Sequence, residues 1–358
     1  MKIRRFFLAC SIVLFILGIC KNSDVVHETF AEAMSQYLYR LLPVLFPYMV
    51  IARLLVSQKL LSSVSEVLPL HRVFRLPDSV MPVFWLGNLC GFPIGAQLTG
   101  ILRKEEKISP EDAGRLCAVS GNVSPAFVVQ VAGGLLWGDV GFGVFLLLVQ
   151  FISCCVFGIL LGRNTVRGDE KYLLSDRQVS EGFGTAFCRA ITESAAGCVT
   201  LCGYIVFFSV LLAVLPLEGV WKALIAGILE FTAGVDEAVR FGGMTGLFFT
   251  GFSVGFGGIC VLAQVSYALG NCGISLKGYF LGKCFQGIVC GLASVVYGFC
   301  FPALYKGDTV RSTLQVYAVL PDGIVKFVFP LLVVCMAGIH YSLYFRFNSV
   351  NSDNSSSN

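Results

Sequence analysis

Two ionisable side chains and several amides lie inside otherwise apolar sequence. Glu230 follows Leu229, and Lys283 lies between Gly282 and Cys284. An ionised group at the centre of a membrane helix costs about 2.5–3.5 kcal/mol, so it indicates function by default. The alternative is that Glu230 lies near an interface and that Lys283 extends toward one. The amides predict bonds between helices or contacts with a polar solute; they are Asn88, Gln97, Gln130, Gln264 and Gln286.

Two glycine-rich stretches interrupt apolar segments of bilayer length. Residues 87–96 contain Gly91, Pro93 and Gly95, and residues 251–260 contain Gly257 and Gly258. Glycine and proline break helices, and the freed backbone groups are costly in hydrocarbon. Such breaks persist where they are buried in protein or line a cavity, and membrane transporters bind substrates at such places. We therefore expect these glycines and Pro93 to border a solute site.

A third break follows a strong helix start. Ser109 is expected as the N-cap, with Pro110 at the first helical position and acidic residues in the first turn. The helix then reaches the polar patch 120–125, which offers the side chains of Ser120, Asn122 and Ser124 to a polar solute. The alternative is a proline kink whose freed carbonyls are satisfied by neighbouring hydroxyls.

Composition places the chain in the membrane. Of 358 residues, 56% are hydrophobic and 13% are charged, whereas soluble domains carry about 25% charged residues. The net charge of +4 gives no reason to expect nucleic acid. The fifteen cysteines form no CxxC pair and no zinc-type cluster with histidine, so we expect packing residues, no metal and no cofactor. Sequence motifs of ATPases, zinc proteases and serine hydrolases are missing, so we expect no enzyme and no catalytic residues.

Hydropathy divides the chain into a series of membrane segments. Residues 1–24 are expected to form an uncleaved signal-anchor helix with its N-terminus in the cytoplasm. A Ser/Asn-rich tail, 348–358, is expected to be disordered. The segment 220–234 is too short to span comfortably and predicts a half-helix or an interfacial piece. The apolar segments after the first are 41–57, 79–102, 113–136, 140–162, 198–216, 220–234, 243–266, 276–301 and 324–345.

Flanking charge predicts how the two glycine-rich segments enter the membrane. The Lys and Arg residues that flank residues 79–102 on either side are Lys59, Arg72, Arg75, Arg103, Lys104 and Lys107. Because basic loops stay in the cytoplasm, this segment favours a re-entrant hairpin over a kinked spanning helix. Its arms of about 11 residues would reach roughly 17 Å, halfway across the core. The flanks of 243–266 are poor in Lys and Arg, which predicts a second hairpin from the opposite face.

The two glycine-rich segments also suggest an internal repeat. A shift of 164 residues aligns Gly87 with Gly251 and Gly91 with Gly255. Shifts of 166 and 157 align further residues in the same order along the chain. Ordered matches of this kind are typical of duplication, and opposite entry of the copies would make the repeat inverted, as in many secondary transporters.

The same motifs resemble a known family. Residues 91–96 (Gly-Phe-Pro-Ile-Gly-Ala), 107–109 (Lys-Ile-Ser), 229–232 (Leu-Glu-Phe-Thr) and 256–261 (Phe-Gly-Gly-Ile-Cys-Val) are similar to the sporulation integral membrane proteins of the YlbJ type. In the patch 120–125 only Asn122 and Pro125 match that family's pattern. The resemblance implies two nucleoside-recognition (Gate) domains and a role in late sporulation, with dipicolinate as the expected cargo.

Together these observations predict an all-α polytopic membrane protein built from two inverted Gate-type repeats with two re-entrant hairpins. The repeats are expected at 25–165 and 183–301, separated by a cytoplasmic loop at 166–182 and followed by a loop and helix at 302–347. The expected function is a transporter for a small polar or anionic solute, with dipicolinate first. The alternatives are a nucleoside transporter and a membrane scaffold for spore assembly.

The expected partners are the lipid bilayer, the solute and a coupling ion such as H⁺ or Na⁺. Further copies of the chain are another candidate partner. The expected location is the bacterial cell membrane, with the mother-cell-derived membrane of the forespore as a specific site. The residues expected to bind solute are Asn88, Gly91, Pro93, Gly95, Gln97, Ser120, Asn122, Ser124, Glu230, Gly257, Gly258, Gln264, Lys283 and Gln286.

Overall fold

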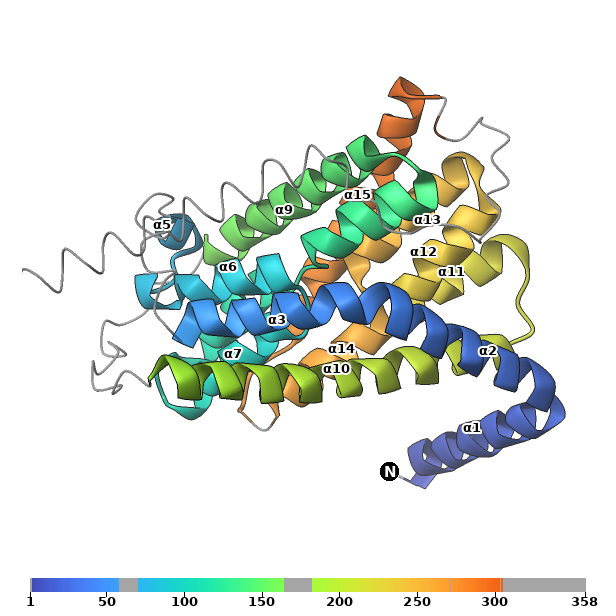
Figure 1. Cartoon of the computed structure of the whole chain (residues 1–358), viewed down its shortest axis with the longest axis horizontal. Helices are drawn as coiled ribbons and strands as arrows, with labels where there is room; N and C mark the ends of the chain where they lie inside the picture. Colours follow the sequence, from blue (N-terminus) through green and yellow to red (C-terminus); the bar gives the residue numbers. More distant parts are fainter. Residues whose placement is uncertain (1, 58–69, 164–181, 271, 303, 305–358) are drawn as a thin grey trace, which may run out of the picture. The chain divides into compact units, whose positions relative to one another are not determined.

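The computed structural model describes residues 2–57, 70–163, 182–270, 272–302 and 304, and every regular element in these ranges is helical (Figure 1). Within these described ranges, four helical segments are long and apolar enough to cross a membrane: Val140–Gly162, Phe183–Val214, Gly243–Leu269 and Lys277–Cys300. The predicted class of all-α multi-pass membrane protein is therefore confirmed. Except for residues 182, 302 and 304, the predicted loop 166–182, the C-terminal helix and the tail lie outside the described residues.

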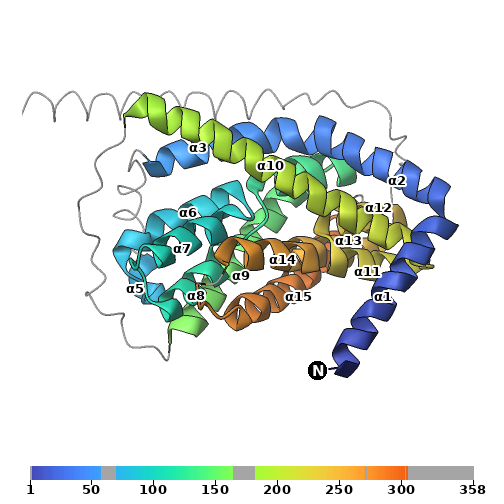
Figure 2. The same ribbon diagram turned by 90° about the horizontal axis from the view of Figure 1, so that it is seen from below.

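A long helical stretch near the N-terminus packs on a second long helix. Helix α1 (Lys2–Lys21) leads into α2 (Ser23–Gln36), a π-helical turn η1 (Tyr37–Leu41) and α3 (Leu42–Ser57). Helix α10 (Phe183–Val214) runs beside α2 and α3 (Figures 1 and 2). The Tyr37 hydroxyl donates to the Cys198 carbonyl at 2.6 Å and ties the two together. The predicted apolar segment 198–216 is the second half of α10.

The first glycine-rich segment forms two short helices that pack on each other. After α5 (Leu70–Phe74) and the 3₁₀ turn η2 (Asp78–Val80), helix α6 (Met81–Cys90) and helix α7 (Ile94–Lys104) form the first helix pair. Gly91 makes the turn with φ of 78°, a backbone angle that glycine adopts without strain. The break predicted in residues 87–96 is therefore present, and its turn is Gly91-Phe92-Pro93.

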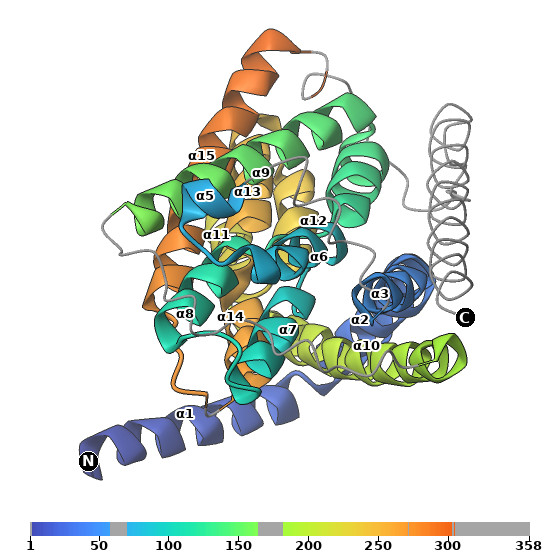
Figure 3. The same ribbon diagram turned by 90° about the vertical axis from the view of Figure 1, so that its left-hand side faces the viewer.

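In the first half of the chain, the helix pair is followed by a broken helix, which consists of α8 (Pro110–Val119) and η3 (Ala126–Trp137), and then by helix α9 (Val140–Gly162). Helix α8 begins where predicted, with the Ser109 hydroxyl accepting from the Asp112 backbone N–H at 3.0 Å. The backbone then unwinds through residues 121–124 and continues as the π-helix η3. Helix α9 packs back on η3 and lies beside α15 (Figure 3).

The second half has a similar order of elements. Helix α11 (Gly219–Leu229) and helix α12 (Phe231–Phe241) pack on each other as the second helix pair, with Glu230 at the turn. Helix α13 (Gly243–Phe256) and helix α14 (Gly258–Leu269) are separated at Gly257, and α15 (Lys277–Cys300) follows. Helix α13 packs on α15, whereas α14 packs on α7 and α11.

This arrangement corrects the predicted pairing. Residues 251–260 are not the turn of a packed pair; they interrupt a 27-residue apolar segment, Gly243–Leu269. Elements of the same kind begin 137 residues apart, at 94 and 231 for α7 and α12 and at 140 and 277 for α9 and α15. The shift of 164 instead matched the turn at Gly91 with Gly255. A methyl group on Gly255 would lie 2.4 Å from the Gln286 carbonyl oxygen, so this glycine permits close packing on α15.

Candidate functional site

The turns of both helix pairs and the breaks of both broken helices meet in one place. At the first turn, a methyl group on Gly91 would lie 2.8 Å from the backbone nitrogen of Ser124. At the second, a methyl group on Gly258 would lie 3.2 Å from the Cα of Glu230. Each turn therefore lies against the broken helix of its own half.

Aromatic rings join the two halves at this point. The ring of Phe92, in the first turn, lies 5.7 Å from the ring of Phe231, which follows the second turn, and the two meet edge to face. Phe231 also contacts Phe127, at 5.0 Å between ring centres. A methyl group on Gly257 would lie 3.1 Å from the Phe92 ring. Four irregular segments that are distant in sequence thus border one small region.

Buried amides and Lys283 form a hydrogen-bonded network beside these turns. The Asn122 amide donates to the Asn88 side-chain oxygen at 2.5 Å, and the Asn122 oxygen accepts from Lys283 Nζ at 2.9 Å and from Gln286 Nε2 at 3.0 Å. Lys283 Nζ also donates to Gln286 Oε1 at 2.7 Å. Asn88 donates in turn to the Val119 carbonyl at 2.9 Å, next to the broken backbone. The network connects α6, the first break and α15.

Lys283 is the charged member of this network, and it is buried with 2% of its surface exposed. Among the described residues, no carboxylate lies within ion-pair distance of its ammonium group. The ammonium nitrogen lies 5.5 Å from the centre of the Phe92 ring and 5.8 Å from that of Tyr279. Its partners in the described part of the chain are neutral amide oxygens and the faces of two rings, and no negative side chain there balances its charge.

Glu230 is the second buried ionisable group of the region, at 1% exposure. One carboxylate oxygen, Oε2, accepts from the Ala233 backbone N–H at 2.8 Å and from the Thr232 hydroxyl, and so caps α12. The other oxygen, Oε1, is buried and has no hydrogen-bond partner. Glu230 therefore caps α12 with one carboxylate oxygen, while its other carboxylate oxygen has no hydrogen-bond partner.

The remaining predicted residues fall into two groups. A methyl group on Gly95 would lie 2.0 Å from the Ser120 carbonyl oxygen, so Gly95 packs closely on the first break. The Ser120 hydroxyl is buried and has no hydrogen-bond partner. Ser124 accepts weakly from the Phe127 N–H at 3.4 Å, and Pro93 ends the first turn with a cis peptide bond after Phe92. These residues border the network.

Gln97, Gln264 and Gln130 are not part of the network. The Gln97 oxygen accepts from Arg53 at 2.9 Å, and Arg53 also pairs with Glu193, which links α7 to α3 and α10. The Gln264 amide donates to the Cys260 sulfur at 3.2 Å. Gln130 is exposed. Of the five predicted amides, Asn88 and Gln286 are the ones that meet Lys283 and Asn122.

Sequence reasoning missed three residues of the region. Gln150 is buried in α9, where its backbone carbonyl accepts from Gln286 at 3.1 Å and its amide donates to the Val254 carbonyl at 3.4 Å. An amide inside an apolar segment was the available signal for it. Phe92 and Phe231 carry no such signal, because aromatic residues are common in membrane helices.

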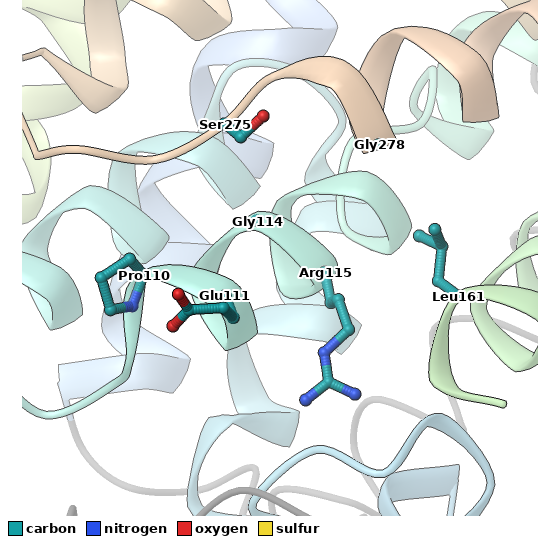
Figure 4. Close-up of a pocket in the computed structure, with 7 residues that line it drawn as sticks. All are labelled: Pro110, Glu111, Gly114, Arg115, Leu161, Ser275 and Gly278. Carbon is teal, nitrogen blue, oxygen red and sulfur yellow. The ribbon is translucent and has the colours of Figure 1, made fainter. Parts of the chain in front are cut away.

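A surface pocket of about 160 Å³ lies apart from this network (Figure 4). Glu111 and Arg115 of α8 line it together with Ser275 and Gly278 near the start of α15. Arg115 is paired with Asp112 in the same helix. None of the predicted site residues lines this pocket. In the described part of the chain, no group of His, Cys, Asp and Glu side chains could hold a metal ion.

Comparison with known proteins supports the expected resemblance. The chain is similar to the sporulation integral membrane protein YlbJ of Bacillus subtilis (strain 168), with 23% identity over 331 residues that cover 80% of this chain and 81% of that protein. No family model matches the chain. No solved structure is significantly similar to it.

Proposed function

We propose that this multi-pass membrane protein, a relative of the YlbJ-type sporulation proteins, is a transporter for a small anionic solute. The observation that carries the proposal is Lys283, a buried ammonium group without a carboxylate partner among the described residues, at the place where both turns and both breaks meet. An unbalanced charge is costly in a low-dielectric interior. A bound anion would offset that cost, so the site favours an anion over a neutral nucleoside.

The irregular backbone supports transport over a purely structural role. Unwound segments at membrane depth are tolerated where they line a cavity, and transporters place their substrates there. Helices α7 and α14 both begin at this site, and helix N-termini carry partial positive charge that suits anions. A scaffold for spore assembly would need neither the breaks nor the buried charge.

The proposed mechanism is alternating access, with the two helix pairs acting as re-entrant hairpins from opposite faces. Arg103 and Lys104 end α7 on the expected cytoplasmic side, whereas α12 carries Asp236 and Glu237 at its middle and a single basic residue, Arg240, in its last turn on the expected outer side. The matching order of elements in both halves then describes an inverted repeat of Gate-type units. Cysteines introduced at Lys104 and Gly242, in a background without native cysteines, should react with an impermeant reagent from opposite faces. Labelling of both from one face would contradict the inverted arrangement.

Glu230 is the best candidate for binding a coupling ion. Its free oxygen Oε1 is buried beside the second break, and either a proton or Na⁺ would satisfy it. We propose that ion binding at Glu230 accompanies solute binding at Lys283.

The direct test is uptake by liposomes that contain the purified protein. Labelled dipicolinate, uridine and guanosine serve as probes, and we expect uptake of dipicolinate. Lys283→Met should lower that uptake about 30-fold or more, because truncating one partner of a buried charge pair costs 2–5 kcal/mol. Lys277→Met is the matched control, since Lys277 is exposed at the start of the same helix, and it should leave uptake unchanged.

The scaffold alternative is tested in cells. Spores that lack the protein should contain less dipicolinate than normal, and Lys283→Met should reproduce the defect at normal protein levels. Normal dipicolinate content in these spores, together with no uptake of any probe, would exclude transport of these solutes.

A further inference from the structure

Phe92 has an unusual place among the partners of Lys283. It is the middle residue of the first turn, Gly91-Phe92-Pro93, and its ring lies over the Lys283 ammonium nitrogen at 5.5 Å. The same ring lies on Gly257 and meets Phe231. The Phe92 ring therefore contacts both the Lys283 ammonium group and the break between α13 and α14 at Gly257.

The other partners of the ammonium group are more firmly held. Tyr279 is on the same helix, one turn before Lys283, and is buried at 2% exposure. The amide oxygens of Asn122 and Gln286 belong to the buried network. Phe92 is only partly buried and lies outside regular helix. Asn122 also lies outside regular helix but is buried, so of these partners Phe92 is the one that combines a non-helical backbone with a partly exposed side chain.

An anion and the Phe92 ring would compete for the same group. Both interact with the ammonium charge through negative potential, but a full negative charge is a much stronger partner in a desolvated site than a ring face is. The ring can remain over Lys283 only until an anion binds there. Its departure would also break its contacts with Phe231 and Gly257, which join the first turn to the second half.

We infer that Phe92 is a competitive cap: it covers Lys283 when no solute is bound and must leave for an anion to bind. This inference rests on the proposed anion site and adds a residue that joins binding to movement of the first helix pair. The inference predicts that substitution of Phe92 raises the affinity for the anion, whereas substitution of a residue that contacts the solute lowers it. Removal of the ring should strengthen anion binding.

The first experiment measures dipicolinate binding to the purified full-length protein by calorimetry. Phe92→Leu, which keeps an apolar side chain but removes the ring face, should bind about 2- to 30-fold more tightly, the range of a cation–π contact. Phe92→Tyr keeps a ring and should bind like the wild type. Phe157→Leu is the matched control, because it removes a ring that stacks on Phe285 at 5.9 Å but leaves the Phe92 ring near Lys283 and in contact with Phe231; its affinity should stay within about 2-fold of wild type. Weaker or unchanged binding by Phe92→Leu would overturn the inference.

A second measurement needs no solute. A small acylating reagent is applied to each variant, and modification of Lys283 is followed by mass spectrometry, with the exposed Lys277 as the internal reference. We expect Lys283 to react several-fold faster in Phe92→Leu than in wild type or in Phe157→Leu. Equal rates would overturn the cap even if the protein transports dipicolinate. Faster modification with no uptake of any anion would instead refute the proposed function and leave the covering role of Phe92 supported. Thermal unfolding of each variant checks that it is folded.

Discussion

The two helix pairs have the same form and opposite chemistry. In α6/α7 the turn is neutral and uses the positive φ of Gly91. In α11/α12 a single extended residue, Glu230, makes the turn and caps the next helix with its carboxylate. The surroundings differ in the same way: the first half supplies only neutral amides, Asn88 and Asn122, whereas the second supplies the amide Gln286 and both ionisable groups, Glu230 and Lys283. The two halves thus share an order of elements, but the buried ionisable groups of the site belong to the second half.

The largest expected effect is the loss of stability when a glycine of the first turn or of the second break is replaced by alanine. Gly91→Ala and Gly258→Ala should each lower the free energy of unfolding by about 2–5 kcal/mol, through backbone strain and overpacking. Both have positive φ, and a methyl group would lie 2.8 Å from the Ser124 nitrogen and 2.9 Å from the Leu229 oxygen respectively. Denaturation in detergent measures the loss. Gly273→Ala is the control, because its φ is +70° but nothing lies within 4 Å; it should cost only about 1–2 kcal/mol.

The next prediction compares the amides of the two halves. Asn122→Leu removes the shared partner of Asn88, Lys283 and Gln286, and it should reduce anion uptake about 10- to 100-fold and stability by about 1–3 kcal/mol. Gln264→Leu removes only a bond to the Cys260 sulfur and should change uptake less than about 3-fold. Similar losses of uptake in both variants would contradict a special role of Asn122 in anion binding. Liposome uptake and thermal unfolding are the measurements.

A third prediction separates the two roles of Glu230. Glu230→Gln keeps an oxygen that can cap α12 but loses the charge, whereas Glu230→Ala loses both. The alanine variant should be about 1 kcal/mol less stable than the glutamine variant, the usual value of an N-cap. Both should transport without dependence on a proton or sodium gradient. A gradient dependence that persists in Glu230→Gln would place the coupling ion elsewhere.

The smallest effect compares the starts of two helices. The Ser109 hydroxyl accepts from the Asp112 N–H at 3.0 Å at the start of α8, while the Ser275 hydroxyl accepts from the Lys277 N–H at 3.4 Å before α15. Ser109→Ala should lower the free energy of unfolding by about 1 kcal/mol, and Ser275→Ala by only a few tenths. Equal losses, measured by denaturation, would show that the longer bond contributes as much as the shorter one.

Sequence alone determined the membrane class, the break at Gly91-Phe92-Pro93, the Ser109 cap and the presence of two ionisable residues, Lys283 and Glu230, inside apolar segments. Each of these follows from local chemistry: apolar length, the conformational range of glycine, the hydroxyl acceptor of a cap, and the cost of a buried charge.

Tertiary structure decided which breaks correspond and which amides meet. Glycine has two uses that look alike in sequence, since Gly91 makes a turn while Gly255 lets α13 approach α15. The predicted repeat therefore matched unlike elements. Asn122, Gln286 and Gln97 are all amides in apolar sequence, yet helix packing brings two of them to Lys283 and turns the third toward Arg53. Which partner a buried polar group finds depends on neighbours that are distant in sequence, and only the packed helices bring those neighbours together.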